Sequence, residues 1–311
     1  LYLTIDEVIQ YIVERELDKG MVELKAKRGM ILAMDPMTGA ILAMAARPTY
    51  NPNYYYEEPD FVRRNPIVSD AYEPGSTFKI ITAAAALEEG IVKPNDTFFD
   101  PGFIKVANRY VRCWLDGGHG SQTFKEATEN SCNVVFAMLG ARLGQEQFYK
   151  YIQAFGLGDP LGIDYPGEAG GLLQRPKNVG PVELANISFG QGISVTPIQL
   201  LCALSAIANG GTLLRPHLVS KIVDPDGFIV KDFHKEPIRQ VISKKTAEEL
   251  SLILESVVEN GSGFRAMVPG YRVAGKTGTA EKPGRGGYSD KRIASFLGFA
   301  PVDNPKIAIL V

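Results

Sequence analysis

The chain contains the stretch EPGSTFK at residues 73–79, which predicts the start of a helix with a serine in its first turn and a lysine one turn later. Residues 80–89 continue the helical pattern. Residues three apart share a helix face, so the hydroxyl of Ser76 is expected beside the amine of Lys79. A lysine amine desolvated by apolar neighbours would have a lowered pKa and would serve as a base for a serine nucleophile. By itself, S-x-x-K is more typical of an ordinary helix start with a solvated lysine, so the pair needs further motifs beside it.

The composition is that of a folded protein with a large core. The chain has 311 residues, 45% hydrophobic and 22% charged, which is enough for one large or two smaller domains. Its formal net charge is -2 and it has no long basic run, which argues against nucleic acid as a partner. No segment is typical of a membrane span or a signal peptide, and a strand-like run is still in progress at the last residues. We therefore expect the chain to be part of a longer protein.

Hydrophobic periodicity and turn residues predict an α+β fold. An amphipathic helix opens the chain, and apolar runs at residues 30–34 and 40–45 predict a hairpin that is buried on both faces. The later predicted elements are helices at 133–143, 146–155, 197–208 and 244–260, a hairpin at 218–223 and 228–233, and strands at 271–279, 293–299 and 307–311. Residues 93–124 are rich in Gly, Pro and Asn, and they show no regular pattern.

The order of these elements predicts a single domain, residues 1–311, with two lobes. Two early and three late strands would pair as a five-stranded antiparallel sheet flanked by helices, in a lobe of about residues 1–70 and 210–311. The helical middle of the chain, about residues 80–210, would form an all-helical lobe beside it.

A second polar group lies where the irregular stretch meets a helix. Ser131-Cys132-Asn133 is the only S-x-N sequence in the chain. Such a junction would direct both polar side chains into a cleft, where Ser131 relays a proton and the Asn133 amide holds a peptide group. The same residues are also typical of a simple helix cap.

A third polar group ends a predicted strand. Lys276, Thr277, Gly278 and Thr279 precede a Gly- and Pro-rich loop at residues 282–287. Alternation along the strand puts Lys276 and the side-chain-free Gly278 on one face. An extended substrate would lie against this strand while lysine and threonine bind its carboxylate.

Residues 270–277 (GYRVAGKT) also satisfy the phosphate-binding pattern G-x-x-x-x-G-K-[ST]. That loop requires a turn leading into a helix, whereas residues 271–274 are strand-like and the glycines and proline that follow oppose a helix. Nucleotide binding is therefore the weaker interpretation.

The three motifs occur in the order expected of one catalytic constellation, S-x-x-K, S-x-N and K-T-G. Longer segments agree with it: YEPGSTFK at residues 72–79, SFGQG at 188–192, KTGTA at 276–280 and SFLGFAP at 295–301. Over essentially its whole length, the chain resembles the transpeptidase domain of class B penicillin-binding proteins. The stretch from Cys113 to Asn133 is most similar to the sporulation-specific members of that family.

This resemblance implies a serine D-Ala-D-Ala transpeptidase that cross-links peptidoglycan stem peptides and is acylated by β-lactams. The implied roles are Ser76 as nucleophile, Lys79 as base, Ser131 as proton relay, Asn133 as substrate clamp, Lys276 with Thr277 and Thr279 as carboxylate site, and the N–H groups of Ser76 and Thr279 as oxyanion hole. It also implies an extracytoplasmic location, with the membrane anchor, a pedestal and the contact with a glycosyltransferase outside this chain.

Two rival functions use the same fold. A β-lactamase must also activate water for deacylation, and residues 183–186 (ELAN) are similar to a motif that does so, although the spacing differs. A β-lactam sensor or a scaffold would keep the fold without turnover. We expect slow deacylation, because no second carboxylate stands in a recognisable water-activating motif.

A final cluster of residues predicts one structural zinc ion. Cys113, Asp116 and His119 follow one another at short spacing, and Cys132 lies inside the S-x-N motif. Zinc held by these four residues would fix Ser131 and Asn133 in the cleft. Two alternatives remain open: Cys132 as a small core residue, or a disulfide between Cys113 and Cys132 in an oxidising compartment.

Overall fold

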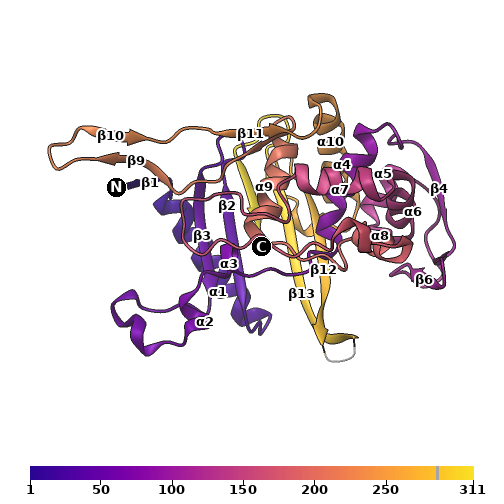
Figure 1. Ribbon diagram of the computed structural model, residues 1–311, viewed down its shortest axis with the longest axis horizontal. Coiled ribbons are helices and arrows are strands. Elements are labelled where there is room, and N and C mark those ends of the chain that lie inside the picture. The colour runs from indigo at the N-terminus through magenta and orange to yellow at the C-terminus, as the bar shows by residue number, and fades with distance from the viewer. Residues whose placement is uncertain (285–286) are drawn as a thin grey trace.

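The computed structural model describes residues 1–284 and 287–311, and its centre is a five-stranded antiparallel sheet (Figure 1). The strand order is β12-β13-β14-β2-β3. The strands are β2 (Gly29–Met34), β3 (Ile41–Arg47), β12 (Ala274–Gly284), β13 (Gly287–Ala300) and β14 (Ile307–Leu310). The predicted α+β fold and five-stranded sheet are confirmed. The loop predicted at residues 282–287 is shorter than expected, because β12 and β13 extend into it; its residues 285–286 lie outside the described part of the chain.

Helices cover both faces of the sheet. Helix α1 (Glu7–Glu23) packs on β2 and β3 through a small core that includes Val13, Leu17, Ile31 and Ala33. On the other face, Leu32 and Met34 belong to the main core, where α9 (Pro197–Ala208) and α10 (Lys244–Asn260) pack. Alternate side chains of β2 therefore enter two different cores, as predicted for a strand that is buried on both faces.

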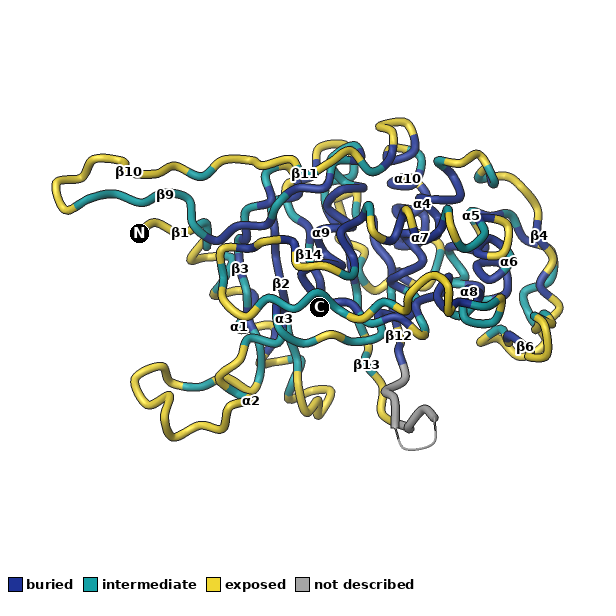
Figure 2. Tube along the Cα trace, viewed as in Figure 1, coloured by how far each residue is buried: buried dark blue, intermediate teal, exposed yellow. Residues whose placement is uncertain are grey.

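A group of helices adjoins the β12 edge of the sheet, on the right in Figure 1. It comprises α4 (Lys79–Glu88), α5 (Phe124–Glu129), α6 (Asn133–Leu143), α7 (Gln145–Ala154) and α8 (Pro181–Ile187). Helix α4 is buried from Lys79 to Leu87, and Figure 2 shows it as dark blue inside the other helices. A helix that is apolar on every side requires burial on every side, which explains its central place.

The remaining elements are short, and several form the exposed arms drawn in yellow in Figure 2. The short helices are α2 (Asp60–Arg63), α3 (Pro66–Ser69), η1 (Pro52–Glu57), η2 (Gly75–Phe78), η3 (Pro176–Asn178) and η4 (Phe264–Ala266). The predicted hairpin consists of β9 (Val219–Val223) and β10 (Ile229–Asp232), and β1 (Tyr2–Leu3) pairs with the free edge of β9 to make a three-stranded sheet. A separate pair is formed by β8 (Thr212–Leu214) and β11 (Pro237–Gln240). None of the helices in the described residues is both long and apolar enough to span a bilayer.

The stretch 93–124 is more regular than its sequence predicts. It holds four strands, β4 (Thr97–Asp100), β5 (Phe103–Val106), β6 (Arg109–Arg112) and β7 (Gly120–Thr123), paired as β4 with β7 and β5 with β6. Each has four residues and an exposed face, so the apolar alternation is too short to be recognised between glycine-rich turns. Strand β4 ends at Asp100, which is part of the candidate site described below.

Candidate active site

Ser76 and Lys79 lie at the start of the buried helix, as predicted. Ser76 belongs to the 3₁₀ turn η2 and is partly exposed, and Lys79 begins α4 with its side chain fully buried. Gly75 precedes the serine with φ of 56°, a left-handed conformation that suits glycine. The nucleophile candidate is thus presented at the surface of the helix start while the amine points into the protein.

The segment of residues 188–192 packs against this turn and forms hydrogen bonds with it. The N–H of Gly75 donates to the carbonyl of Gly190 at 3.0 Å. A Cβ on Gly190 would lie 2.0 Å from the oxygen of Gly75, so only glycine fits there. The N–H of Gly192 also donates to the Glu73 carboxylate at 3.1 Å. The segment SFGQG at residues 188–192 therefore holds the serine turn in place.

The S-x-N motif meets Lys79 directly. Lys79 Nζ lies 2.6 Å from the carbonyl oxygen of Ser131, 3.2 Å from its Oγ and 2.8 Å from Asn133 Oδ1. Ser131 has φ of 53°, which costs a non-glycine residue about 1–2 kcal/mol. This unusual backbone, between α5 and α6, brings both the carbonyl and the hydroxyl of Ser131 to the amine.

The surroundings of Lys79 favour its neutral form. Burial is the main cause that lowers its pKa well below the usual lysine value, and the positive charge of Lys276 acts in the same direction. A neutral amine has two N–H donors and one lone pair. If the donors go to Ser131 O and Asn133 Oδ1, the lone pair is left for a hydroxyl proton.

The K-T-G motif lies on β12, at the edge of the sheet. Lys276 is fully buried, its Nζ donates to the Thr277 carbonyl at 3.2 Å, and burial lowers its pKa to about 7. Thr277 Oγ1 donates to Ser262 Oγ at 3.1 Å. Ser262 follows α10, and its N–H donates to the carbonyl of Glu129, two residues before Ser131. Sequence reasoning missed Ser262, which links the two motifs and carries no local pattern of its own.

Gly278 has a different role from the one predicted. A Cβ at this position would lie 2.7 Å from Ser295 Oγ, 2.9 Å from Thr77 Cγ2 and 3.1 Å from the carbonyl oxygen of Pro74. Its missing side chain is required by the packing of η2 against β12 and β13, and it does not leave space for a substrate. Thr279, the next residue along β12, is exposed. A Cβ on Gly75 would lie 2.8 Å from its carbonyl oxygen, so β12 and the serine turn are in close contact.

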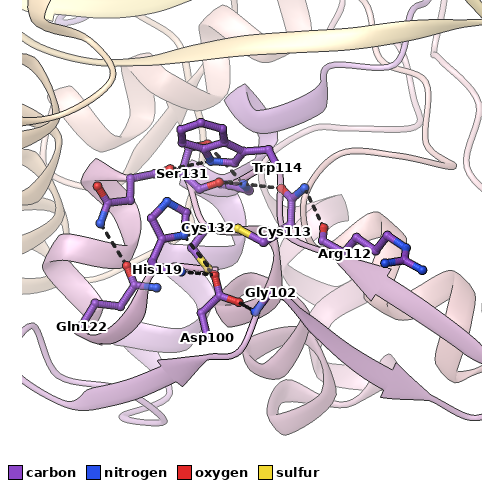
Figure 3. Close-up of polar contacts among 12 residues, drawn as sticks. Asp100, Gly102, Arg112, Cys113, Trp114, His119, Gln122, Ser131 and Cys132 are labelled. Atoms are coloured by element: carbon purple, nitrogen blue, oxygen red, sulfur yellow. Dashed lines mark hydrogen bonds and ion pairs between the residues drawn. The ribbon is translucent and has the colours of Figure 1, made fainter. Parts of the chain in front are cut away.

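Four side chains cluster behind the S-x-N motif (Figure 3). They are Asp100, Cys113, His119 and Cys132, and their nitrogen, oxygen and sulfur atoms all lie within 4.8 Å of one another. Asp100 Oδ2 is the centre: it lies 3.0 Å from His119 Nδ1 and 3.2 Å from Cys132 Sγ. Cys113 Sγ lies 3.2 Å from His119 Nδ1.

Electrostatics in this cluster centre on the buried carboxylate. Burial raises the pKa of Asp100, but hydrogen bonds from Cys113, His119, Gly102 and Cys132 more than offset it and leave the pKa well below its usual value. Burial, with the nearby Asp100, raises the pKa of Cys132 to about 12, and the Cys113 pKa is raised for the same reasons. These shifts favour an ionised Asp100 beside protonated thiols.

The prediction that Asp116 completes this cluster is wrong. Asp116 is exposed and lies outside the group, and Asp100 of β4 takes its place. The chain folds back through the β4–β7 pair, which brings residue 100 opposite residue 120. Cys113 and Cys132 are free thiols in this structure, so the predicted alternative of a disulfide is not formed here.

The comparison with known proteins agrees with this geometry. The family model for the penicillin binding protein transpeptidase domain matches residues 29–311. The chain belongs to this penicillin-binding protein family.

Relatives of this penicillin-binding protein domain include a sporulation protein, as the sequence resemblance implied. Stage V sporulation protein D of Bacillus subtilis (strain 168) is 48% identical over 99% of this chain and 48% of that protein. PbpB of Mycolicibacterium smegmatis is 36% identical over 99% of this chain and 49% of that protein. The chain spans about half the length of the curated relatives it matches.

Solved structures of the family superimpose closely. Apo penicillin binding protein 3 of Mycobacterium tuberculosis gives a TM-score of 0.93 at 33% identity, over 99% of this chain and 71% of that chain. The same protein complexed with aztreonam gives 0.93 at 34% identity, over the same shares of the two chains.

Segments of this penicillin-binding protein domain that suggested other chemistry have structural roles. Residues 274–277 of the phosphate-binding pattern lie in β12, so no turn leads into a helix there. Glu183, in the segment similar to a deacylation motif, accepts the N–H of Gly180 at 3.0 Å and caps α8.

Proposed function

We propose that this domain is a serine D,D-transpeptidase of peptidoglycan. Ser76 Oγ would attack the penultimate D-alanine carbonyl of a stem peptide, form an ester with it and release the terminal D-alanine. A neighbouring peptide amine would then take the acyl group and free the serine. The observation that supports this most is the contact of Lys79 with Ser131 and Asn133. These two residues lie 52 and 54 positions after Lys79 in the sequence, so the contact brings two separate motifs together around one desolvated amine.

The proton path follows from these contacts. Lys79, whose neutral form is favoured by burial, would accept the Ser76 proton across one helical turn. Ser131, whose Oγ lies 3.2 Å from Lys79 Nζ, would pass a proton to the departing amine. The side-chain N–H₂ of Asn133 would hold the substrate peptide group, since its Oδ1 already accepts from Lys79.

The β12 edge would bind the substrate strand and its carboxylate. Lys276 supplies a positive charge when protonated, and Thr277 and Thr279 supply hydroxyl groups beside it. When a carboxylate binds, the Thr277 proton would turn to it, and Ser262 Oγ, in contact with Thr277 Oγ1, would donate to Thr277 instead. The N–H groups of Ser76 and Thr279 would stabilise the tetrahedral oxyanion, consistent with the close approach of Gly75 to Thr279.

The second-order rate constant of acylation, which combines noncovalent binding with the acylation step, should have a bell-shaped dependence on pH. It should rise as Lys79 loses its proton, at a pH well below that of an ordinary lysine. It should fall above about pH 7, because burial lowers the Lys276 pKa to about 7 and the neutral amine no longer attracts a carboxylate. Lys276→Arg should remove this alkaline fall, because a guanidinium stays protonated. A rate that rises steadily to about pH 9 in the unaltered protein would contradict the role given to Lys276.

Adduct lifetime separates the transpeptidase from a β-lactamase. We expect the penicilloyl adduct to persist through a chase of about one hour, because the one carboxylate suspected of activating water, Glu183, is engaged in capping α8. Intact-protein mass spectrometry measures this directly. Steady turnover of a chromogenic cephalosporin would identify a β-lactamase, and stable acylation without exchange of peptide amines would identify a sensor or scaffold.

We also propose that Asp100, Cys113, His119 and Cys132 bind one structural zinc ion. Zn–S bonds of about 2.3 Å and Zn–N or Zn–O bonds of about 2.0–2.1 Å place tetrahedral ligand atoms about 3.3–3.8 Å apart. The cluster, with its ligand atoms within 4.8 Å of one another, needs only small movements to reach this geometry. Zinc would take the place of the thiol protons and tie Cys132 to β4, and it would take no part in acyl transfer.

The cellular context follows from the family. Bacterial relatives named stage V sporulation protein D and probable peptidoglycan D,D-transpeptidase PenA support a role in bacterial cell-wall or spore synthesis. We propose that the domain works on the extracytoplasmic side of the cytoplasmic membrane, where its substrate lies. A glycosyltransferase that supplies the glycan strand would be its partner.

A further inference from the structure

An exposed tryptophan contacts the turn that carries the S-x-N motif. Trp114 is the only tryptophan of the chain, and 63% of it is exposed. It lies in the loop between β6 and β7, and its indole Nε1–H donates to the carbonyl of Asn130 at 2.9 Å (Figure 3). A tryptophan this exposed contributes little to a core, so its hydrogen bond is the feature that needs an explanation.

The carbonyl that accepts this bond, that of Asn130, lies at the end of α5 and directly before Ser131. Asn130 caps the C-terminus of α5, where carbonyl groups need partners from outside the helix. The next residue, Ser131, has φ of 53°. Such a conformation persists only where neighbouring contacts hold it. The N–H of Trp114 fixes the peptide plane that directly precedes this strained residue.

The indole is itself held in place. Its ring contacts the His119 ring edge to face, with centroids 5.4 Å apart. Asn130 is held a second time by strand β7, because its Nδ2 donates to Gln122 Oε1 at 3.0 Å. Trp114 of the loop and Gln122 of β7 thus each form a hydrogen bond with Asn130, the residue before Ser131.

We propose that Trp114 is a positioning residue for acyl transfer: its N–H holds the Ser131 turn so that the carbonyl and the hydroxyl of Ser131 meet Lys79. Ser131 O and Oγ lie 2.6 and 3.2 Å from Lys79 Nζ, and they depend on that turn. The inference rests on the proposed acyl-transfer function. Trp114 touches no reacting atom in this scheme; it acts through Ser131.

The test is Trp114→Phe, which keeps an aromatic ring beside His119 and removes the N–H together with the pyrrole part of the indole. Tyr110→Phe, on β6 in the same lobe, is the matched control, because it also removes one polar group from an exposed aromatic ring. For each protein, stopped-flow acylation by a penicillin gives the first-order acylation rate and the dissociation constant of the noncovalent complex. Zinc content and melting temperature are measured on the same samples.

We expect the acylation rate of Trp114→Phe to fall about tenfold, the value of one hydrogen bond, with the dissociation constant, zinc content and melting temperature unchanged. Tyr110→Phe should match the unaltered protein. An unchanged acylation rate in Trp114→Phe, a weaker noncovalent complex as the only effect, or a loss of zinc or stability that accounts for the defect would each overturn the proposal. If the unaltered protein formed no adduct at all, the proposed function itself would fail, which is a separate result.

Discussion

Replacing Lys79 by methionine should slow acylation by penicillin about a thousandfold, because the serine would lose its base. Methionine is apolar and of similar length, so it fills the fully buried space that the lysine occupies. The chain should therefore fold, although Ser131 O and Asn133 Oδ1 lose a donor. The rate is measured with labelled penicillin, and folding is checked by thermal unfolding.

Lys276→Met is the matched control for this change, because Lys276 is the other fully buried lysine of the site. It should weaken the noncovalent complex with penicillin, because the carboxylate loses its cation, and reduce the acylation step itself much less. Lys79→Met should slow the acylation step strongly and weaken the noncovalent complex much less. If the two variants had the same kinetic defect, the separate roles given to the two lysines would be wrong.

Asp100→Asn should remove zinc from the protein and, with it, most of the acylation. The amide is a poorer zinc ligand than a carboxylate, and the variant leaves His119 and Cys132 without the anion that they contact at 3.0 and 3.2 Å. Cys132 lies between Ser131 and Asn133, so its release would loosen the contacts of Lys79. Elemental analysis of protein purified without chelator should find about one zinc per unaltered chain and none in the variant.

Asp116→Asn is the control that distinguishes the zinc ligands grouped in the structure, which include Asp100, from those predicted by sequence, which include Asp116. Asp116 is exposed and outside the cluster, so this variant should keep its zinc and its acylation rate. Loss of zinc in Asp116→Asn alone would restore the ligand set predicted from the sequence. A thiol count identifies the remaining alternative: two missing thiols and no metal would mean a Cys113–Cys132 disulfide in the purified protein.

Much of the fold could be predicted from local sequence. Helices α6 (Asn133–Leu143) and α9 (Pro197–Ala208) have the predicted limits, because a helix start is encoded next to the helix itself. Thr196 accepts the N–H of Gln199, and Pro197 occupies the first turn. The strands of residues 93–124 were missed, since four-residue strands owe their existence to partners distant in the sequence.

The same distinction applies to the candidate site. Ser76 with Lys79, Ser131 with Asn133, and Lys276 with Thr277 are local pairs, and each could be found from spacing. Asp100, Ser262 and Trp114 are single residues whose partners come from other segments, so no spacing pattern includes them. Gly278 can be recognised as part of the K-T-G motif from sequence. The structural reason for a glycine at this position cannot, because the neighbours that would clash with a side chain belong to η2 and β13.

The central claim, that Ser76 is the acylated nucleophile, is tested most directly by mass spectrometry of the zinc-loaded protein after incubation with penicillin. We predict a single penicilloyl adduct on the intact protein, located on Ser76 by peptide mapping, and no adduct on Ser76→Ala. An adduct that persists in Ser76→Ala, or a folded and zinc-loaded unaltered protein that never acquires one, would contradict the account.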